Sequence, residues 1–347
     1  MSVSPGRLLQ EIYMERSTTL SITAHICVLL SLMAPSALLG GSEVPIPLLS
    51  QWEENMLTYS EKHVDDAAYT IGADNASESH VWYYDGARVY YQIADWSGND
   101  QWIDAAETVN TAYRNYVFSV GSMHGWRIFP HGLLMHYQRT GDLKSKQAAL
   151  LLANASKFAS TGGGPNEAFS RETAYCINAW LVAETIGEPR NPNLKQAVDW
   201  ALGHIDQWFV EQSSGNWAPF MFGLTCEALI DYYHQVEQDP RILTAIKLGL
   251  DACWERAWVE ADEAFWYRAD NPVKGTGTLN PLIAPAYAWV YLQTGDTLYR
   301  DRGDQIFAGG VRGAWLEGGK QFSQSYRWSF DYVKWRSEAE RQRVGAQ

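Results

Sequence analysis

Six short segments of the sequence each combine aromatic rings with hydrogen-bonding or ionisable side chains. They span residues 82–88, 123–132, 167–175, 216–221, 274–281 and 322–327. Flat rings stack on the C–H faces of sugars, while charged and polar groups bind sugar hydroxyls. Core packing explains this recurrence less readily than it explains any one residue. The substrate-binding side chains expected in these segments are Trp82, Tyr84, His124, Trp126, Arg127, Arg171, Tyr175, Trp217, Asn280, Gln324, Tyr326 and Arg327.

Asp85 and Glu172 are the best-placed carboxyl pair in these segments. Glycoside hydrolysis requires one protonated and one ionised carboxyl group. Both residues also have plain structural explanations, because Asp85 could cap a helix and Glu172 could complement a helix dipole. Asp331 fits an ion pair with an arginine better than catalysis. Glu184 and Glu227 lie further along their expected helices, below the floor of any site.

His131 is the third candidate catalytic residue, since histidine can act as a general base near neutral pH. It could equally bind a hydroxyl or a loop carbonyl. Together with Arg171 and Tyr175 it would suit a lyase, in which a cation neutralises a uronate and a base removes its C5 proton. Hydrolysis and β-elimination therefore both remain open at this point.

Five short turn signals indicate the elements that must position these residues. They lie at 97–100, 140–142, 186–188, 237–240 and 294–296, with a spacing of roughly 43 to 57 residues that is typical of a repeated unit. Each turn follows an apolar, aromatic segment and precedes a more amphipathic one. Glycine in the turn can end the first helix in a left-handed conformation, and aspartate can cap the second. The pattern predicts helical hairpins with a buried inner helix and an outer helix.

A sixth inner helix is predicted at 321–332, and the unpaired helix at 52–64 is expected to close the ring beside it. The result is an all-α protein with six inner and six outer helices. Over residues 48–337 this pattern resembles the (α/α)6 toroid, or six-hairpin, carbohydrate-active enzymes. That group includes unsaturated glucuronyl hydrolases, other glycoside hydrolases and the toroid domains of some polysaccharide lyases. The resemblance implies a funnel on the long-loop side, where the amino ends of the inner helices converge.

Composition narrows the possible partners. The chain has 347 residues, 46% of them hydrophobic, with 16 Trp, 19 Tyr and 11 Phe and a formal net charge of −13. The negative electrostatic field of this net charge repels nucleic acid, and the sequence has no cluster of basic residues to counter it. The histidines lack paired ligand spacing, so no metal and no cofactor is expected. The glycine-rich runs at 161–165 and 275–277 are expected to be loops.

The first 41 residues are typical of a secretory signal. An apolar stretch from Leu20 to Gly41 follows Arg16, which predicts a secreted or periplasmic protein, with an uncleaved membrane anchor as the alternative. Residues 42–347 are then expected to form a single toroid domain. The sequence thus favours a glycoside hydrolase acting on an oligo- or polysaccharide. A polysaccharide lyase and a non-catalytic saccharide-binding toroid are the alternatives.

Overall fold

The computed structural model describes residues 44–70, 80–214, 217–268, 272 and 274–345. The described residues all belong to one compact unit. The predicted signal segment lies outside the described residues. Within those residues, no helix is both long enough and apolar enough to cross a bilayer.

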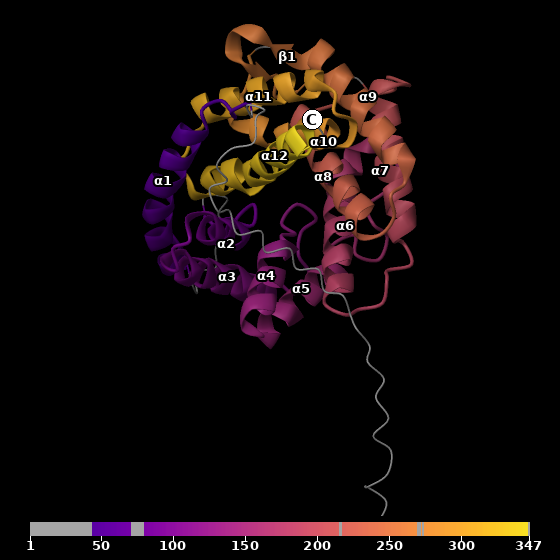
Figure 1. Ribbon diagram of the computed structural model, residues 1–347. Helices are drawn as coiled ribbons and strands as arrows, with labels where there is room; N and C mark the ends of the chain where they lie inside the picture. The colour runs from indigo at the N-terminus through magenta and orange to yellow at the C-terminus, as the bar shows by residue number, and fades with distance from the viewer. Residues whose placement is uncertain (1–43, 71–79, 215–216, 269–271, 273, 346–347) are drawn as a thin grey trace, which may run out of the picture. The chain divides into compact units, whose positions relative to one another are not determined.

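Six inner helices form a closed ring, in which each contacts the next and the last contacts the first. Six outer helices surround them (Figure 1). The predicted (α/α)6 toroid is confirmed. The inner helices are α2 (Gly86–Ser97), α4 (Pro130–Thr140), α6 (Ser170–Thr185), α8 (Pro219–Gln235), α10 (Ala284–Thr294) and α12 (Gly319–Gly345). The outer helices are α1 (Leu49–Thr70), α3 (Gln101–Val120), α5 (Leu143–Ala155), α7 (Leu194–Phe209), α9 (Pro240–Ala257) and α11 (Thr297–Arg312).

The long loops contain small elements that the sequence pattern did not predict. Strands β1 (Trp258–Val259) and β2 (Ala264–Phe265) pair antiparallel, with Trp258 opposite Phe265. Short 3-10 helices precede two of the inner helices: η1 (Glu167–Phe169) before α6 and η3 (Gly277–Leu282) before α10. A third, η2 (Glu260–Asp262), joins the two strands. Strands of two residues carry too little alternation to be read from a sequence.

The tight turns have the predicted chemistry. Four glycines adopt a positive φ, with 65° at Gly98, 73° at Gly141, 101° at Gly187 and 69° at Gly295. The side chains of Asp142, Asp239 and Asp296 accept hydrogen bonds from the first backbone N–H groups of the helices that follow them. Asp100 makes no such bond. Asn99 accepts from the backbone N–H of Gln101 instead.

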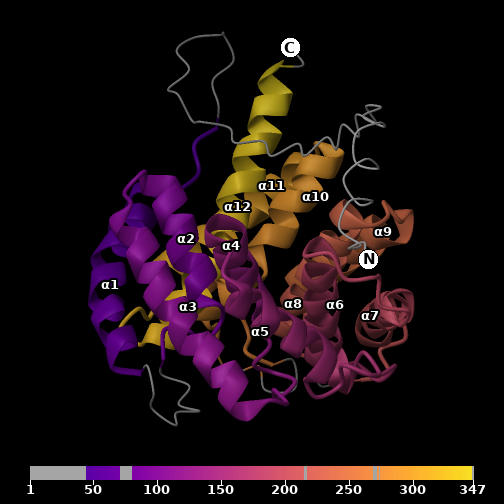
Figure 2. The ribbon, with the colours of Figure 1, turned by 90° about the horizontal axis from the view of Figure 1, so that it is seen from below.

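Helix α12 is longer than the predicted 321–332, and its C-terminal part projects beyond the neighbouring helices (Figure 2). Arg336, which is fully buried, holds this extension to α11 through an ion pair of 3.0 Å between its Nε and Asp304 Oδ1. The inner-helix pattern used for the prediction requires apolar residues at inward positions. Because Arg336 is charged, that pattern did not include this segment. The charge is tolerated because it is paired.

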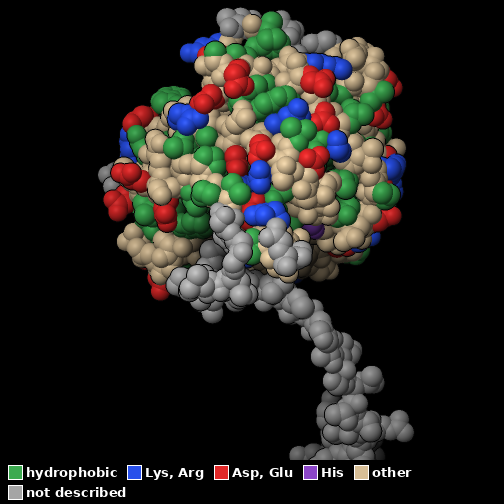
Figure 3. Space-filling view, turned by 45° about the horizontal axis from the view of Figure 1, so that its top comes forward, with side chains coloured by type: hydrophobic (Ala, Val, Ile, Leu, Met, Phe, Trp, Pro, Cys, Tyr) green, Lys and Arg blue, Asp and Glu red, His purple; other side chains and the backbone are tan. Residues whose placement is uncertain are grey.

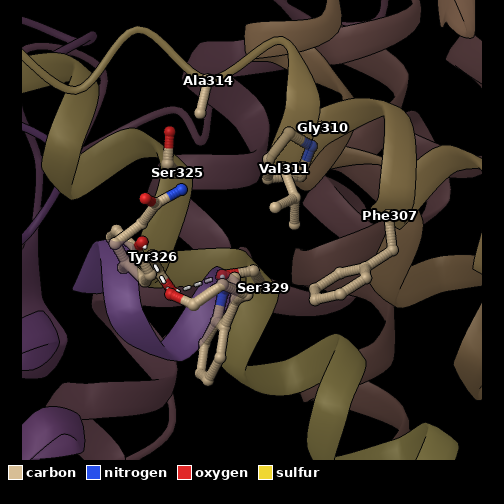
Figure 4. A pocket seen from close by; sticks show the side chains of 10 residues that line it. Phe307, Gly310, Val311, Ala314, Ser325, Tyr326 and Ser329 are labelled. Carbon is tan, nitrogen blue, oxygen red and sulfur yellow. Dashed lines mark hydrogen bonds between the residues drawn. The ribbon is translucent and has the colours of Figure 1, made fainter. Parts of the chain in front are cut away.

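The N-terminal helix α1 closes the ring against α12, as predicted. Trp52 is 3% exposed, and its indole Nε1–H donates to Ser329 Oγ at 2.8 Å. The ring of Trp52 also packs on Phe307, Tyr326 and Phe330. Phe307, Tyr326 and Ser329 line a small pocket that Trp52 also lines, and Figure 4 labels these three residues. This aromatic cluster anchors α1 against α12.

Trp52→Ala is therefore expected to destabilise the protein by about 3–5 kcal/mol, since it removes a large buried ring and leaves a cavity. The measurement is the free energy of unfolding from denaturant titration. Trp315→Ala is the matched control, because Trp315 is 56% exposed. It should change stability by less than about 0.5 kcal/mol. Equal losses in the two variants would contradict the anchoring role of Trp52.

Candidate active site

Asp85 and His131, two of the three predicted catalytic residues, lie next to each other in the centre of the ring. Asp85 precedes α2, and both of its carboxylate oxygens accept from the backbone N–H of Gly132, at 3.0 and 3.2 Å. Its Oδ2 lies 3.8 Å from His131 Nδ1. Asp85 makes no capping bond to α2, so the helix-cap explanation does not account for it. Gly132 is required here, because an added Cβ would lie 2.4 Å from Asp85 Oδ1.

The backbone before α2 is strained. Tyr84 and Asp85 have φ values of 59° and 65°, in the left-handed region that favours glycine. Each such residue costs about 1–3 kcal/mol and persists only where the surroundings impose it. On this backbone the Asp85 side chain contacts Gly132 and His131 and makes no hydrogen bond to its own helix.

A larger group of charged side chains from four inner helices surrounds this pair. His131 Nε2 lies 3.6 Å from Asp231 Oδ2, on the far side of the imidazole from Asp85. Arg88 Nη2 donates to Asp331 Oδ2 at 2.7 Å, and Arg327 Nη2 donates to Glu227 Oε1 at 3.0 Å. Arg88 also reaches Glu227, at 3.3 Å. We refer to the following residues as the central cluster: Asp85, Arg88, His131, Glu227, Asp231, Arg327 and Asp331.

The carboxyl groups of the central cluster differ in their affinity for protons. Burial raises the pKa of Asp85, and the charges of Arg327, His131 and Arg88 offset this only in part. Burial also raises the pKa of Asp331 despite the charge of Arg88. For Glu227, burial acts in the same direction, but Arg327 and Arg88 outweigh it and lower its pKa. Carboxyl groups whose environments separate their pKa values are typical of acid–base sites.

Glu172, the third predicted catalytic residue, lines a cavity of about 280 Å³ at the starts of α6 and α8. We call this cavity the loop-side cleft. The other residues that matter for its chemistry are Glu167, Arg171, Trp217, Phe220 and Tyr267. Glu172 Oε1 accepts from Arg171 Nη2 at 3.0 Å. The Arg171 guanidinium lies 5.7 Å from the centre of the Trp126 ring, which in turn stacks on His124. Asp85 is not among the residues that line the cleft.

A row of aromatic contacts connects the residues before α2 with α6. Tyr84 contacts Phe129 and Trp328, and Phe129 contacts Tyr175 on α6. The Tyr175 hydroxyl is buried and has no hydrogen-bond partner among the described residues. Burial raises the pKa of Tyr175 well above its ordinary value, so the hydroxyl keeps its proton.

Several predicted substrate-binding residues have structural partners instead. Trp82 is 3% exposed and stacks on Tyr113 and Tyr116. Tyr326 donates its hydroxyl hydrogen to Trp52 O, on the side of α12 that faces α1. Arg127 donates to the hydroxyl of Tyr116, Asn280 donates to the carbonyls of Glu263 and Ile306, and Gln324 donates to the carbonyl of Thr278.

Sequence reasoning missed Arg88 and Asp231, and it placed Glu227 below the site. A signal for two of them was present, because Glu227 and Asp231 are four residues apart and therefore share one face of α8.

No group of three or more potential metal ligands occurs in the described part of the chain. On the face shown in Figure 3, acidic and basic side chains are interspersed without a large basic patch.

Glu227→Gln and Asp85→Asn are expected to affect stability in opposite ways. Removing the Glu227 charge leaves Arg327 buried without a counter-ion, at a cost of about 3–5 kcal/mol. Because the pKa of Glu227 is lowered in the folded state, this contribution is present above its ordinary pKa of about 4.3 and is lost as pH falls further.

For Asp85 the sign is reversed. Its raised pKa means that ionisation destabilises the folded state once pH exceeds the ordinary value of about 3.9. Asp85→Asn should therefore be at least as stable as the wild type at pH 7 and gain no advantage at pH 3. Denaturant unfolding at several pH values measures both effects. A large loss of stability in Asp85→Asn at pH 7 would contradict this account.

Comparison with known proteins gives matches in structure only. No protein-family model and no curated protein matches the chain. An unsaturated glucuronyl hydrolase specific for heparin is similar with a TM-score of 0.64 and 11% identity, over 84% of this chain and 98% of that one. An unsaturated glucuronyl hydrolase from Streptococcus agalactiae is similar with a TM-score of 0.58 and 9% identity, over 86% of this chain and 94% of that one. At such identities the likeness shows a shared fold, and the chain therefore has the toroid fold of these hydrolases.

Proposed function

We propose that the protein is a glycoside hydrolase that binds an oligo- or polysaccharide at the starts of the inner helices. The observation that carries this proposal is the state of Asp85. This carboxyl group is buried, on a strained backbone, beside His131 at the centre of the ring, and burial raises its pKa and so favours its protonated form. Such a group is suited to protonate a leaving-group oxygen.

The loop-side cleft supplies the features needed to hold a sugar. Trp217 and Tyr267 offer rings, and Arg171 offers a cation beside Glu172. The similar structures are unsaturated glucuronyl hydrolases, and their names indicate an acidic sugar. We infer that the Arg171 guanidinium would bind the carboxylate of a uronate, because arginine binds carboxylates with two parallel hydrogen bonds.

In this proposal Asp85 is the general acid and Glu172 is the second carboxyl group. Glu172 is ion-paired with Arg171 and would act on the attacking water or on the sugar itself. The Asp85 side chain is 1% exposed, and an acid must come within about 3 Å of the glycosidic oxygen. Saccharide binding must therefore move the side chains that cover Asp85. Tyr84, which is only partly buried, is the neighbour that such a movement would involve.

A lyase is the alternative that the residues His131, Arg171 and Tyr175 would serve. A lyase requires a base that accepts the C5 proton of the uronate. Tyr175 is a poor base, because burial raises its pKa and keeps its hydroxyl protonated. Incubation with a panel of polysaccharides separates the two reactions. Hydrolysis creates reducing ends alone, whereas β-elimination also creates an unsaturated uronate that absorbs ultraviolet light.

Asp85→Asn is expected to lower kcat by about 10²- to 10⁴-fold, since it removes the general acid. In the wild type, kcat should fall as pH rises through the raised pKa of Asp85, and Asp85→Asn should lack this decline. Measuring kcat against pH with the best substrate of the panel tests both expectations. Full turnover by Asp85→Asn would refute the assignment.

Glu172→Gln should also lose activity, while Glu184→Gln serves as its matched control. Glu184 pairs with Arg190 on the surface of the protein, near the end of α6 away from the cleft. Its loss should leave turnover within about twofold of the wild type. Equal activity in Glu172→Gln and Glu184→Gln would remove Glu172 from the mechanism.

A further inference from the structure

The position of Asp85 creates a problem that the proposed acid role does not solve by itself. After Asp85 gives its proton to the leaving group, it is a carboxylate and must be protonated again before the next turnover. Its side chain is 1% exposed, so bulk water reaches it poorly. The inference below rests on the proposed function and concerns the route by which this proton returns.

His131 lies between Asp85 and a carboxyl group that water can reach. Its Nδ1 is 3.8 Å from Asp85 Oδ2, and its Nε2 is 3.6 Å from Asp231 Oδ2. The Asp231 side chain is 26% exposed, and the His131 side chain is 15% exposed. His131 Nδ1 is buried and has no hydrogen-bond partner among the described residues. Both separations exceed a hydrogen bond, and a small shift or one bridging water would close each of them.

The other charged groups of the central cluster are engaged elsewhere. Arg327 is fully buried and bonded to Glu227, and Arg88 is bonded to Asp331 at 2.7 Å. Within the described residues, Asp231 has His131 as its one ion-pair partner. Asp231 also lies near the end of α8, one helical turn before the tight-turn side of the ring. It is therefore the carboxyl group best placed to exchange protons with solvent.

We propose that His131 and Asp231 form a proton relay that returns a proton from solvent to Asp85 after each turnover. Asp231 takes a proton from water and passes it to His131 Nε2, while His131 gives the proton on Nδ1 to the carboxylate of Asp85. No bond other than those to the moving protons is made or broken. His131 then holds its proton on Nε2, and turning the ring or exchanging protons with water resets it. In this scheme His131 and Asp231 act through Asp85 and are positioning residues.

Asp231→Asn tests the relay, with Asp331→Asn as the matched control. Both substitutions remove one partly exposed carboxyl group from the same cluster, but only Asp231 faces His131. In Asp231→Asn, kcat should fall about 10- to 100-fold while KM stays within about threefold of the wild type, as expected when proton transfer is slowed. Added imidazole or formate buffer should restore kcat by carrying protons in place of the missing carboxylate. The kcat of Asp331→Asn should not respond to these buffers.

Two further measurements separate the relay from a loss of structure. Asp231→Glu should recover most of kcat, and thermal melts should show that each variant is folded. A solvent deuterium isotope effect on kcat should be larger in Asp231→Asn than in the wild type, because proton return has become rate-limiting. If Asp231 had only a structural role, Asp231→Asn would show neither rescue by added buffer nor a larger solvent isotope effect.

The relay is overturned if Asp231→Asn keeps its kcat, or if it loses kcat and no buffer restores it. The proposed function fails in a different way, since Asp85→Asn would then retain turnover or the wild type would hydrolyse no saccharide. An inactive Asp85→Asn beside an unaffected Asp231→Asn would preserve the hydrolase and reject the relay.

Discussion

The ion pair between Arg327 and Glu227 fixes the centre of the ring. Arg327 is fully buried in the low-dielectric interior, where an unpaired guanidinium would cost several kcal/mol. Glu227 on α8 supplies the counter-charge, and Arg88 on α2 contacts both Glu227 and Asp331. These contacts set the registers of α2, α8 and α12 relative to one another. His131, at the start of α4, lies between Asp85, which precedes α2, and Asp231 on α8.

The hairpin architecture could be predicted because it depends on interactions between residues that are close in the sequence. Gly141 and Asp142 end one helix and start the next through their own backbone preferences, and the same happens at Gly295 and Asp296. The central cluster could be predicted only in part. Asp85 and His131 stand at helix starts, whereas Glu227 lies in the middle of α8 and Asp231 lies one turn before its end. Their role depends on how far α8 is shifted against α2 and α4, and that shift comes from long-range packing rather than from sequence spacing.

The strain at Tyr84 and Asp85 supports a functional role for this part of the ring. At the tight turns the chain uses glycine wherever φ is positive, for example at Gly98 and Gly141. Before α2 it places two residues with large side chains in the same backbone region. The protein also buries the Asp85 carboxyl group, which favours its neutral form. A position that lowers stability in two independent ways is expected where the side chain itself is needed.

The central cluster has more carboxyl groups than guanidinium groups, so bound protons must help to neutralise its negative charge. It contains four carboxyl groups, on Asp85, Glu227, Asp231 and Asp331, but only two guanidinium groups, on Arg88 and Arg327. Glu227 and Asp331 are bonded to those guanidiniums, which leaves Asp85 and Asp231 on opposite sides of His131. A purely structural network would be better stabilised by matching each carboxylate with a fixed positive charge. An imidazole placed between two carboxyl groups of very different exposure instead provides a path along which a proton can move from solvent to a buried acid.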